Sequence, residues 1–65
     1  MEVQLNGESR KLPDKTSVAW LLDDLGVSTG QIVVEINGRV LDRLSYDHTL
    51  CPGDLVEVVE FVGGG

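Results

Sequence analysis

The residues best suited to chemistry are the last three, Gly63, Gly64 and Gly65, which end in a free carboxylate. A terminal carboxylate is ionised at neutral pH and is a nucleophile toward the α-phosphate of ATP. Attack there gives an acyl-adenylate, the activated form that a carboxylate needs before one of its oxygens can be exchanged for sulfur. This activation requires a nucleotide-binding partner enzyme, so we expect Gly65 to be the modified residue and the chain only to deliver it.

Glycines have no side chains to pack against a core, so residues 63–65 are expected to form a flexible tail on a folded domain of residues 1–62. Fully extended, three residues reach roughly 10 Å. Gly63 and Gly64 suit a narrow channel in a partner, because they lack a Cβ. The alternative is an inert frayed end or linker. The position of the glycines, directly after the last predicted strand and at the end of the chain, favours a functional tail.

Two further residues, His48 and Cys51, could carry chemistry, but neither has suitable neighbours in the sequence. His48 has no Cys or Ser in a recognisable triad, and a single cysteine allows neither an internal disulfide nor a CxxC metal site. We expect His48 to be a solvated loop residue and Cys51 to be a small buried hydrophobe. A sulfur relay is the rival role for Cys51. No catalytic residue, metal ion or bound cofactor is expected.

Size and charge limit the classes of partner. A chain of 65 residues forms one domain, and 42% hydrophobic with 25% charged residues is a globular composition. Eleven acidic against five basic residues give a net charge of −6, which argues against nucleic acid and anionic membranes and favours a basic protein surface. No apolar run is long enough for a signal peptide or a membrane span. A cytoplasmic protein that is monomeric when free is therefore expected.

Two Asn-Gly pairs, Asn6-Gly7 and Asn37-Gly38, predict two β-hairpins, because Asn-Gly favours the type I′ turn that joins two twisted strands. The flanking strands are predicted at residues 2–5 and 8–12 and at residues 32–36 and 39–41.

An amphipathic helix of about ten residues is predicted between the hairpins, from apolar residues at the i, i+3, i+4 and i+7 spacing: Val18, Leu21, Leu22 and Leu25. Gly26 suits the left-handed position that ends a helix. Trp20 lies on the side opposite this apolar stripe and is expected to be partly exposed, either lying over loop residues or anchoring a partner.

Residues 42–51 have no sustained periodicity and predict an irregular crossover with one helical turn. Its apolar members are expected to close the edge of the core: Leu44, Tyr46 and Leu50. Residues 55–62 predict the last strand. Glu57 and Glu60 are three residues apart and cannot share a face of a regular strand, so a bulge or a break in pairing is expected near Val59.

This order of elements predicts an α+β domain of the β-grasp type, with a mixed five-stranded sheet packed on one main helix. The last strand fits best in the centre, beside the first strand and parallel to it. The predicted core contains Val3, Leu5, Val18, Leu21, Leu22, Leu25, Val34, Ile36 and Val58. Next to the tail, Val59, Phe61 and Val62 include residues that project away from the helix and are expected to form an exposed apolar surface for a partner.

A combination of short motifs extends over essentially the whole chain: Asn6-Gly7, Leu21-Leu22, the segment 34–40, Gly53-Asp54 and Gly64-Gly65. With these motifs the chain resembles the ThiS family, the ubiquitin-like sulfur carriers of thiamine biosynthesis. Cys51 and Trp20 are not among the features that carry the resemblance.

The resemblance implies that an E1-like adenylyltransferase, using ATP and magnesium, adenylates Gly65. It also implies that a persulfide sulfur donor converts the adenylate to a thiocarboxylate, and that thiazole synthase receives the sulfur. Three alternatives stay open at this point. They are a molybdopterin-synthase small subunit, a ubiquitin-like protein modifier that forms isopeptide bonds, and an interaction module with an inert tail.

Overall fold

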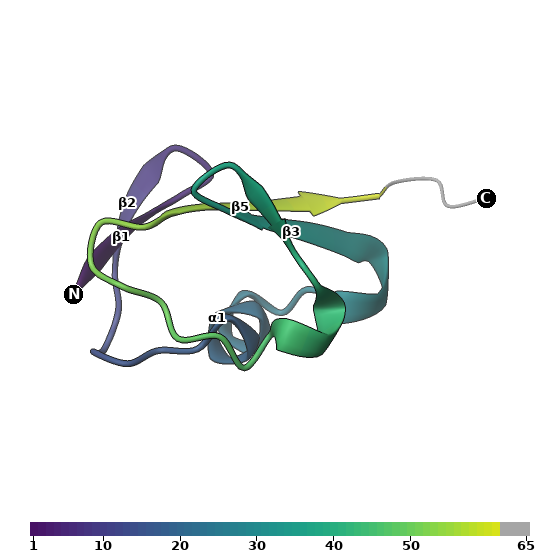
Figure 1. Ribbon diagram of the computed structural model, residues 1–65, viewed down its shortest axis with the longest axis horizontal. Coiled ribbons are helices and arrows are strands. Elements are labelled where there is room, and N and C mark those ends of the chain that lie inside the picture. The colour runs from purple at the N-terminus through teal and green to yellow at the C-terminus, as the bar shows by residue number, and fades with distance from the viewer. Residues whose placement is uncertain (62–65) are drawn as a thin grey trace.

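The computed structural model describes residues 1–61 as a five-stranded mixed sheet with one α-helix against one face (Figure 1). The strands are β1 (Glu2–Leu5), β2 (Glu8–Lys11), β3 (Ile32–Ile36), β4 (Arg39–Leu41) and β5 (Leu55–Glu60). The helix is α1 (Val18–Leu25), and two short 3-10 helices are η1 (Thr29–Gln31) and η2 (Arg43–Ser45). The predicted set of elements is confirmed, including the helical turn in the crossover.

Strand β5 lies in the centre of the sheet, whose order is β2-β1-β5-β3-β4. It pairs in parallel with β1 and antiparallel with β3. This confirms the predicted central position of the last strand beside the first. Strand β5 therefore lies between the two hairpins and pairs with one strand of each.

Both hairpins turn at the predicted Asn-Gly pairs. Asn6 and Asn37 have φ of 51° and 53°, and the glycines that follow have φ of 83° and 84°. A type I′ turn needs positive φ at both central residues, which Asn tolerates and Gly adopts freely.

Helix α1 has eight residues rather than the expected ten. It begins after Ser17, whose hydroxyl accepts a hydrogen bond from the Trp20 amide at 3.1 Å. It ends at Gly26, which has the predicted left-handed conformation with φ of 73°. Side-chain capping at one end and a left-handed glycine at the other satisfy backbone groups that a short helix cannot bond internally.

The core lies between α1 and the sheet. Six of the predicted core residues are buried: Val3, Leu5, Val18, Leu21, Leu22 and Val34. Three others are only partly buried against this cluster: Leu25, Ile36 and Val58. Tyr46 and Leu50, expected at the edge of the core, are also buried, and three buried residues were not expected: Leu12, Ile32 and Val56.

The expected bulge near Val59 is wrong, because β5 pairs with β3 without a break from Val56 to Glu60. The two glutamates do lie on opposite faces, as regular alternation requires. Glu60 is on the helix side, but β5 extends sideways beyond α1 (Figure 1), and both glutamates are exposed. The strand ends at Glu60, and Val62, expected within it, lies outside the described residues.

Two expectations in the crossover are also wrong. Leu44 does not close the core, because its side chain is 93% exposed on η2, whereas Tyr46 and Leu50 are buried as expected. Cys51 is exposed rather than buried. The Cys51 amide donates to the Asp54 carboxylate at 2.8 Å, which fixes a turn that follows the core position of Leu50.

Leu22 has no exposed surface, and its truncation leaves a cavity beneath the sheet. We expect Leu22→Ala to lower the free energy of unfolding by about 2 to 5 kcal/mol, a large part of the stability of a domain of this size. Urea or thermal denaturation measures the change. Leu44→Ala is the matched control, since the same truncation at an exposed site is expected to change stability by less than about 0.5 kcal/mol. Equal effects of the two substitutions would contradict the assigned helix face.

Candidate functional site at the end of the central strand

The candidate site is built on the C-terminal half of β5, which points away from the body of the domain (Figure 1). On one edge β5 is paired with β3 to its last residue, where Ile32 lies opposite Glu60. The Phe61 amide then donates to the carbonyl of Gln31 at 2.8 Å. The backbone is therefore hydrogen-bonded up to the last described residue, to β3 as far as Glu60 and then to Gln31 at the end of η1.

On its other edge β5 is paired with β1 only at Leu55 and Val56. Beyond this point the side chain of Asn6 forms hydrogen bonds with the backbone of Val58: its Oδ1 accepts from the Val58 amide at 2.9 Å, and its Nδ2 donates to the Val58 carbonyl at 3.3 Å. Asn6 was assigned only a turn role from the sequence. One sequence signal for this role is the presence of Asn rather than Asp at the turn, because an amide side chain both donates and accepts hydrogen bonds.

The start of β5 has an equivalent arrangement with the other turn asparagine. Asn37 accepts from the Leu55 amide at 2.9 Å and donates to the Asp54 carboxylate at 3.0 Å. Asp54 is buried, and its second oxygen accepts from the Cys51 amide. The Gly53-Asp54 motif thus fixes the entry of the chain into β5.

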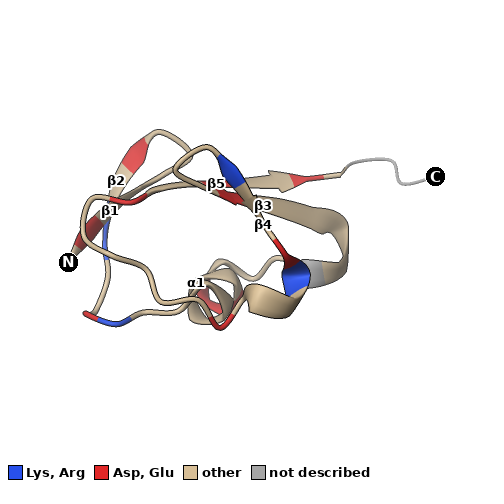
Figure 2. Cartoon of the chain, viewed as in Figure 1, with Lys and Arg blue, Asp and Glu red and all other residues tan. Residues whose placement is uncertain are grey.

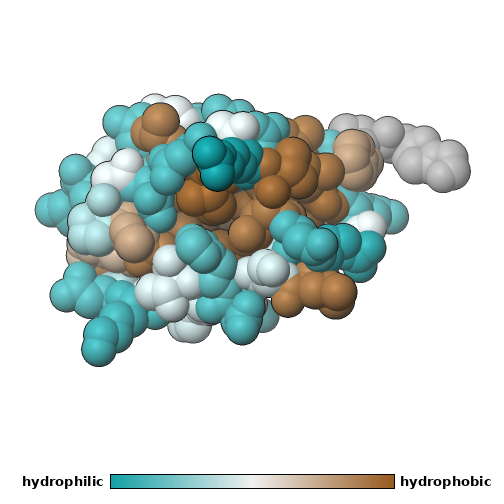
Figure 3. Space-filling model, viewed as in Figure 1, coloured by the Kyte–Doolittle hydropathy of each residue, from teal (hydrophilic) through white to brown (hydrophobic). Residues whose placement is uncertain are grey.

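Apolar side chains of β5 project from the sheet face opposite the helix. Val56 and Val58 face α1, so Leu55 and Val59 lie on the outer face, and Phe61 continues this alternation. Val59 is 46% and Phe61 58% exposed, as expected. Figure 3 shows apolar surface reaching along β5 to the end of the described chain. We call Val59 and Phe61 the exit patch.

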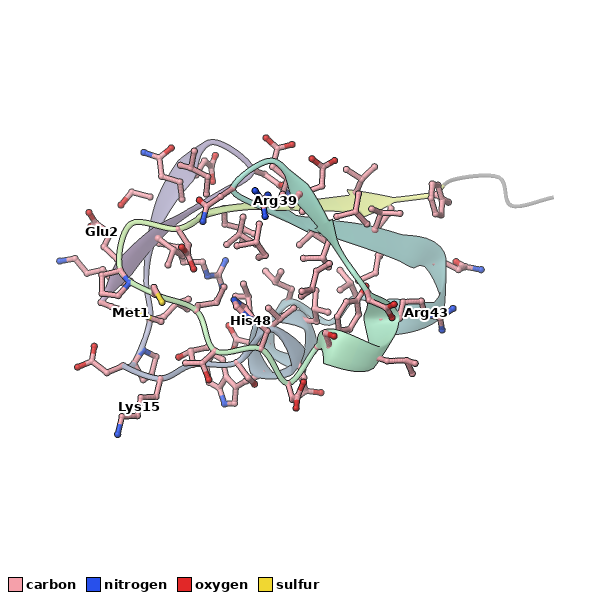
Figure 4. All side chains as sticks on the ribbon, in the orientation of Figure 1. Met1, Glu2, Lys15, Arg39, Arg43 and His48 are labelled. Atoms are coloured by element: carbon pink, nitrogen blue, oxygen red, sulfur yellow. The ribbon has the colours of Figure 1, made fainter. Side chains whose placement is uncertain are left out.

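Acidic residues border the exit patch. Glu57 and Glu60 are exposed on β5, and Figure 2 shows an acidic segment at the end of this strand. The basic residues labelled in Figure 4 lie elsewhere, with Lys15 before α1, Arg39 at the second hairpin and Arg43 in η2. An apolar patch with an acidic border suits a partner surface that is apolar with a basic border.

Val62, predicted as part of the partner surface, and the predicted tail residues Gly63, Gly64 and Gly65 lie outside the described residues. The division into a domain of residues 1–62 and a tail of residues 63–65 therefore stays a prediction, as do the channel and modification roles.

The other singled-out residues lie away from the exit patch. Trp20 is 47% exposed, as expected, and lines a shallow hollow with the loop from Pro13 to Ser17. His48 is exposed, as expected, and lines an open hollow beside β4 together with Cys51 and Arg39. Within residues 1–61, no three His, Cys, Asp or Glu side chains are grouped as metal ligands. None of the helices in this part of the chain has the length and apolar character needed to cross a membrane.

A sheet in this strand order, with one covering helix and a central last strand, defines a ubiquitin-like β-grasp protein. The crystal structure of a thiamine biosynthesis protein (ThiS) from Geobacter metallireducens matches with a TM-score of 0.85 at 36% identity, over 100% of both chains. The predicted fold class is confirmed.

The family model for the ThiS family matches residues 3–65. A sulfur carrier protein ThiS from Bacillus subtilis is 34% identical over 65 residues, which are 97% of this chain and 98% of the relative. The chain therefore belongs to the ThiS family, as its motifs indicated.

A longer relative is also similar. A thiazole synthase from Paramagnetospirillum magneticum is 36% identical over 66 residues, and this match covers 100% of the chain but 20% of the relative. The chain thus spans about a fifth of the length of that protein.

The buried Asp54 carboxylate has two protein donors, and its removal leaves both without a partner. We expect Asp54→Ala to lower the free energy of unfolding by about 1.5 to 3 kcal/mol, the usual range for hydrogen bonds to a charged group. Asp47→Ala, at an exposed loop position, is the control and is expected to be nearly neutral. Denaturant titration of the two variants compares them. An unchanged free energy of unfolding in Asp54→Ala would mean that this turn does not depend on the carboxylate.

Proposed function

We propose that this chain is a sulfur carrier protein of thiamine biosynthesis whose Gly65 carboxylate becomes a thiocarboxylate. A carboxylate oxygen attacks the α-phosphorus of ATP and pyrophosphate leaves, which gives the glycyl-adenylate. The terminal sulfur of a persulfide donor then displaces AMP at the carbonyl carbon and gives an acyl disulfide. A thiol, on the donor or in solution, attacks the donor sulfur of this disulfide, which releases the thiocarboxylate and leaves a new disulfide between the thiol and the donor. Membership of the ThiS family over residues 3–65 is the observation that carries this proposal.

The catalytic work lies in the partners. An E1-like adenylyltransferase binds ATP and Mg²⁺, while the carrier is a co-substrate with no catalytic residue and no cofactor of its own. The carrier acts in the cytoplasm and is monomeric when free. Its net charge of −6 favours fast association with basic enzyme surfaces through electrostatic steering.

Thiazole synthase is the proposed acceptor of the sulfur. Support comes from the relative named thiazole synthase, in which a segment similar to this whole chain makes up 20% of the polypeptide. Covalent linkage of a carrier to its acceptor raises their effective concentration. A carrier and a thiazole synthase that are separate chains must instead recognise each other through a surface.

The exit patch is the proposed docking surface for the adenylyltransferase, extended by Val62. Val59 and Phe61 are exposed, apolar and next to the tail in sequence. Contacts here bring the three glycines to the enzyme while leaving them free to enter a narrow channel. Binding energy from the patch is then used to orient a terminal carboxylate that has no side chain of its own.

Variants that change the length or the width of the tail test this function most directly. Deletion of Gly65 leaves a carboxylate on Gly64 but shortens the reach by about 3.3 to 3.6 Å, whereas attack needs the reacting atoms roughly 3 to 3.5 Å apart. Gly64→Val keeps the length but adds bulk and restricts the backbone. ATP-pyrophosphate exchange with the adenylyltransferase is expected to collapse in both variants, with melting temperatures close to that of the wild type.

The melting curves serve as the control for folding in this experiment. Undiminished exchange in both tail variants would contradict the carrier role and favour an interaction module with an inert tail.

A charge placed in the exit patch tests the docking surface. Phe61→Asp is expected to raise the KM for the carrier in the exchange assay by roughly tenfold or more, because burial of an unpaired carboxylate at the interface is unfavourable. Leu44→Asp places the same charge on an exposed leucine of η2 and is expected to leave KM unchanged. Equal kinetics for Phe61→Asp and the wild type would remove Phe61 from the contact.

A further inference from the structure

The backbone hydrogen-bonding groups on the two edges of β5 have different kinds of partner. Its pairing with β3 runs from Val56 to Glu60, but its parallel pairing with β1 stops at Val56. Strand β1 ends at Leu5, and the chain then turns back into β2. Among residues 1–61, no strand therefore lies beside this edge in the half of β5 that leads to the tail.

Asn6 takes the place of the missing strand. Its backbone amide donates to the Val56 carbonyl at 2.9 Å, and its side chain forms hydrogen bonds with both the amide and the carbonyl of Val58. A primary amide has the donor and acceptor of a peptide group, so the side chain continues the β1–β5 ladder by one further step. The side-chain contacts with Val58 join residues 52 positions apart in sequence. Asp at this position keeps the acceptor but loses the donor, and Gly loses both.

Asn37 offers a built-in comparison. It has the same turn conformation and also bonds to β5 through its side chain, but at Leu55 and Asp54, the residues where the strand begins. The two asparagines thus do similar structural work at opposite ends of β5. Asn6 alone of this pair bonds to the end that leads to the exit patch.

We propose that Asn6 is a positioning residue for the C-terminal tail. Glycines carry little stiffness of their own, so the direction in which they leave the domain depends on how the end of β5 is held. Strand β3 bonds these residues along one edge and Asn6 bonds them along the other, which keeps the strand end from pivoting about its β3 edge. This role rests on the proposed function, since it concerns the delivery of Gly65 to the adenylyltransferase.

The test compares Asn6→Gly with Asn37→Gly. Glycine adopts positive φ without strain, so each substitution removes the side-chain bonds and preserves the turn. In the free carrier we expect the Val58 amide to exchange with deuterium at least roughly tenfold faster in Asn6→Gly, with no comparable change at Val58 in Asn37→Gly. NMR-detected exchange, at a temperature where both variants are folded, measures this directly.

In the adenylation assay with the carrier as varied substrate, we expect Asn6→Gly to lower kcat by roughly ten- to a hundredfold, the effect of a small misplacement of a reacting group. The KM for the carrier is expected to stay close to that of the wild type, because the exit patch keeps its side chains. Asn37→Gly is expected to lose stability while keeping its kcat. Asn6→Asp retains the bond from the Val58 amide and is expected to lie between the wild type and Asn6→Gly in both measurements.

Unchanged Val58 exchange in Asn6→Gly, or equal losses of kcat in the two glycine variants, would overturn the positioning role. If Asn6→Gly unfolds, Asn6→Asp decides the matter with the same two measurements, and wild-type values in that variant would also overturn it. Failure of the wild-type chain to be adenylated would instead refute the proposed function, while Val58 exchange in the free chain still decides whether Asn6 orders the end of β5.

Discussion

The structure depends on the hydrogen bonding of β5 along both of its edges. This strand is the last in the chain and lies at the centre of the sheet, with β1 and Asn6 on one edge and β3 and Asn37 on the other. Its inner side chain Val56 is 1% exposed and belongs to the core. The outer side chains Val59 and Phe61 are exposed near the tail. One strand therefore connects the buried core of the domain to the residues proposed to react.

The single helix explains why this arrangement leaves a surface free. Helix α1 covers one face of the sheet, and Val18, Leu21 and Leu22 fill the space between them. No second layer is present in the described chain to cover the other face, and the exit patch lies there. Because a domain of this size buries a modest share of its surface, it has little stability to lose. The predicted tail consists of glycines, which have no side chain to pack, so changes there are expected to alter activity without altering stability.

Local sequence patterns were sufficient to predict most of the helices, strands and turns of the fold. The Asn-Gly pairs predicted both hairpins because the type I′ turn is a local preference, and the spacing of Leu21, Leu22 and Leu25 predicted the helix and its buried side. The bulge at Val59 was wrongly expected because both glutamates were assumed to need the same, exposed face of β5. The end of β5 extends beyond α1, so Glu60 is exposed although it lies on the helix side. Leu44 and Cys51 lie in segments without periodicity, where burial is decided by long-range contacts.

The side-chain bonds of Asn6 and Asn37 could not be predicted, because each joins a turn to a distant part of the chain. The bonds of Asn37 fix where β5 begins, and those of Asn6 hold the half of the strand that leads to the exit patch. Motif resemblance identified the family, but only the packed structure connects the two turn motifs to the strand that carries the tail.

Intact-mass spectrometry of the carrier tests the central claim most directly. The wild-type chain is incubated with the adenylyltransferase, ATP, Mg²⁺ and a persulfide sulfur donor, and its mass is compared with that of a sample lacking ATP. The proposed function predicts an ATP-dependent mass increase equal to replacement of one oxygen by one sulfur, located by fragmentation at Gly65. An unchanged mass, under conditions in which the same enzymes convert the Bacillus subtilis relative, would contradict it.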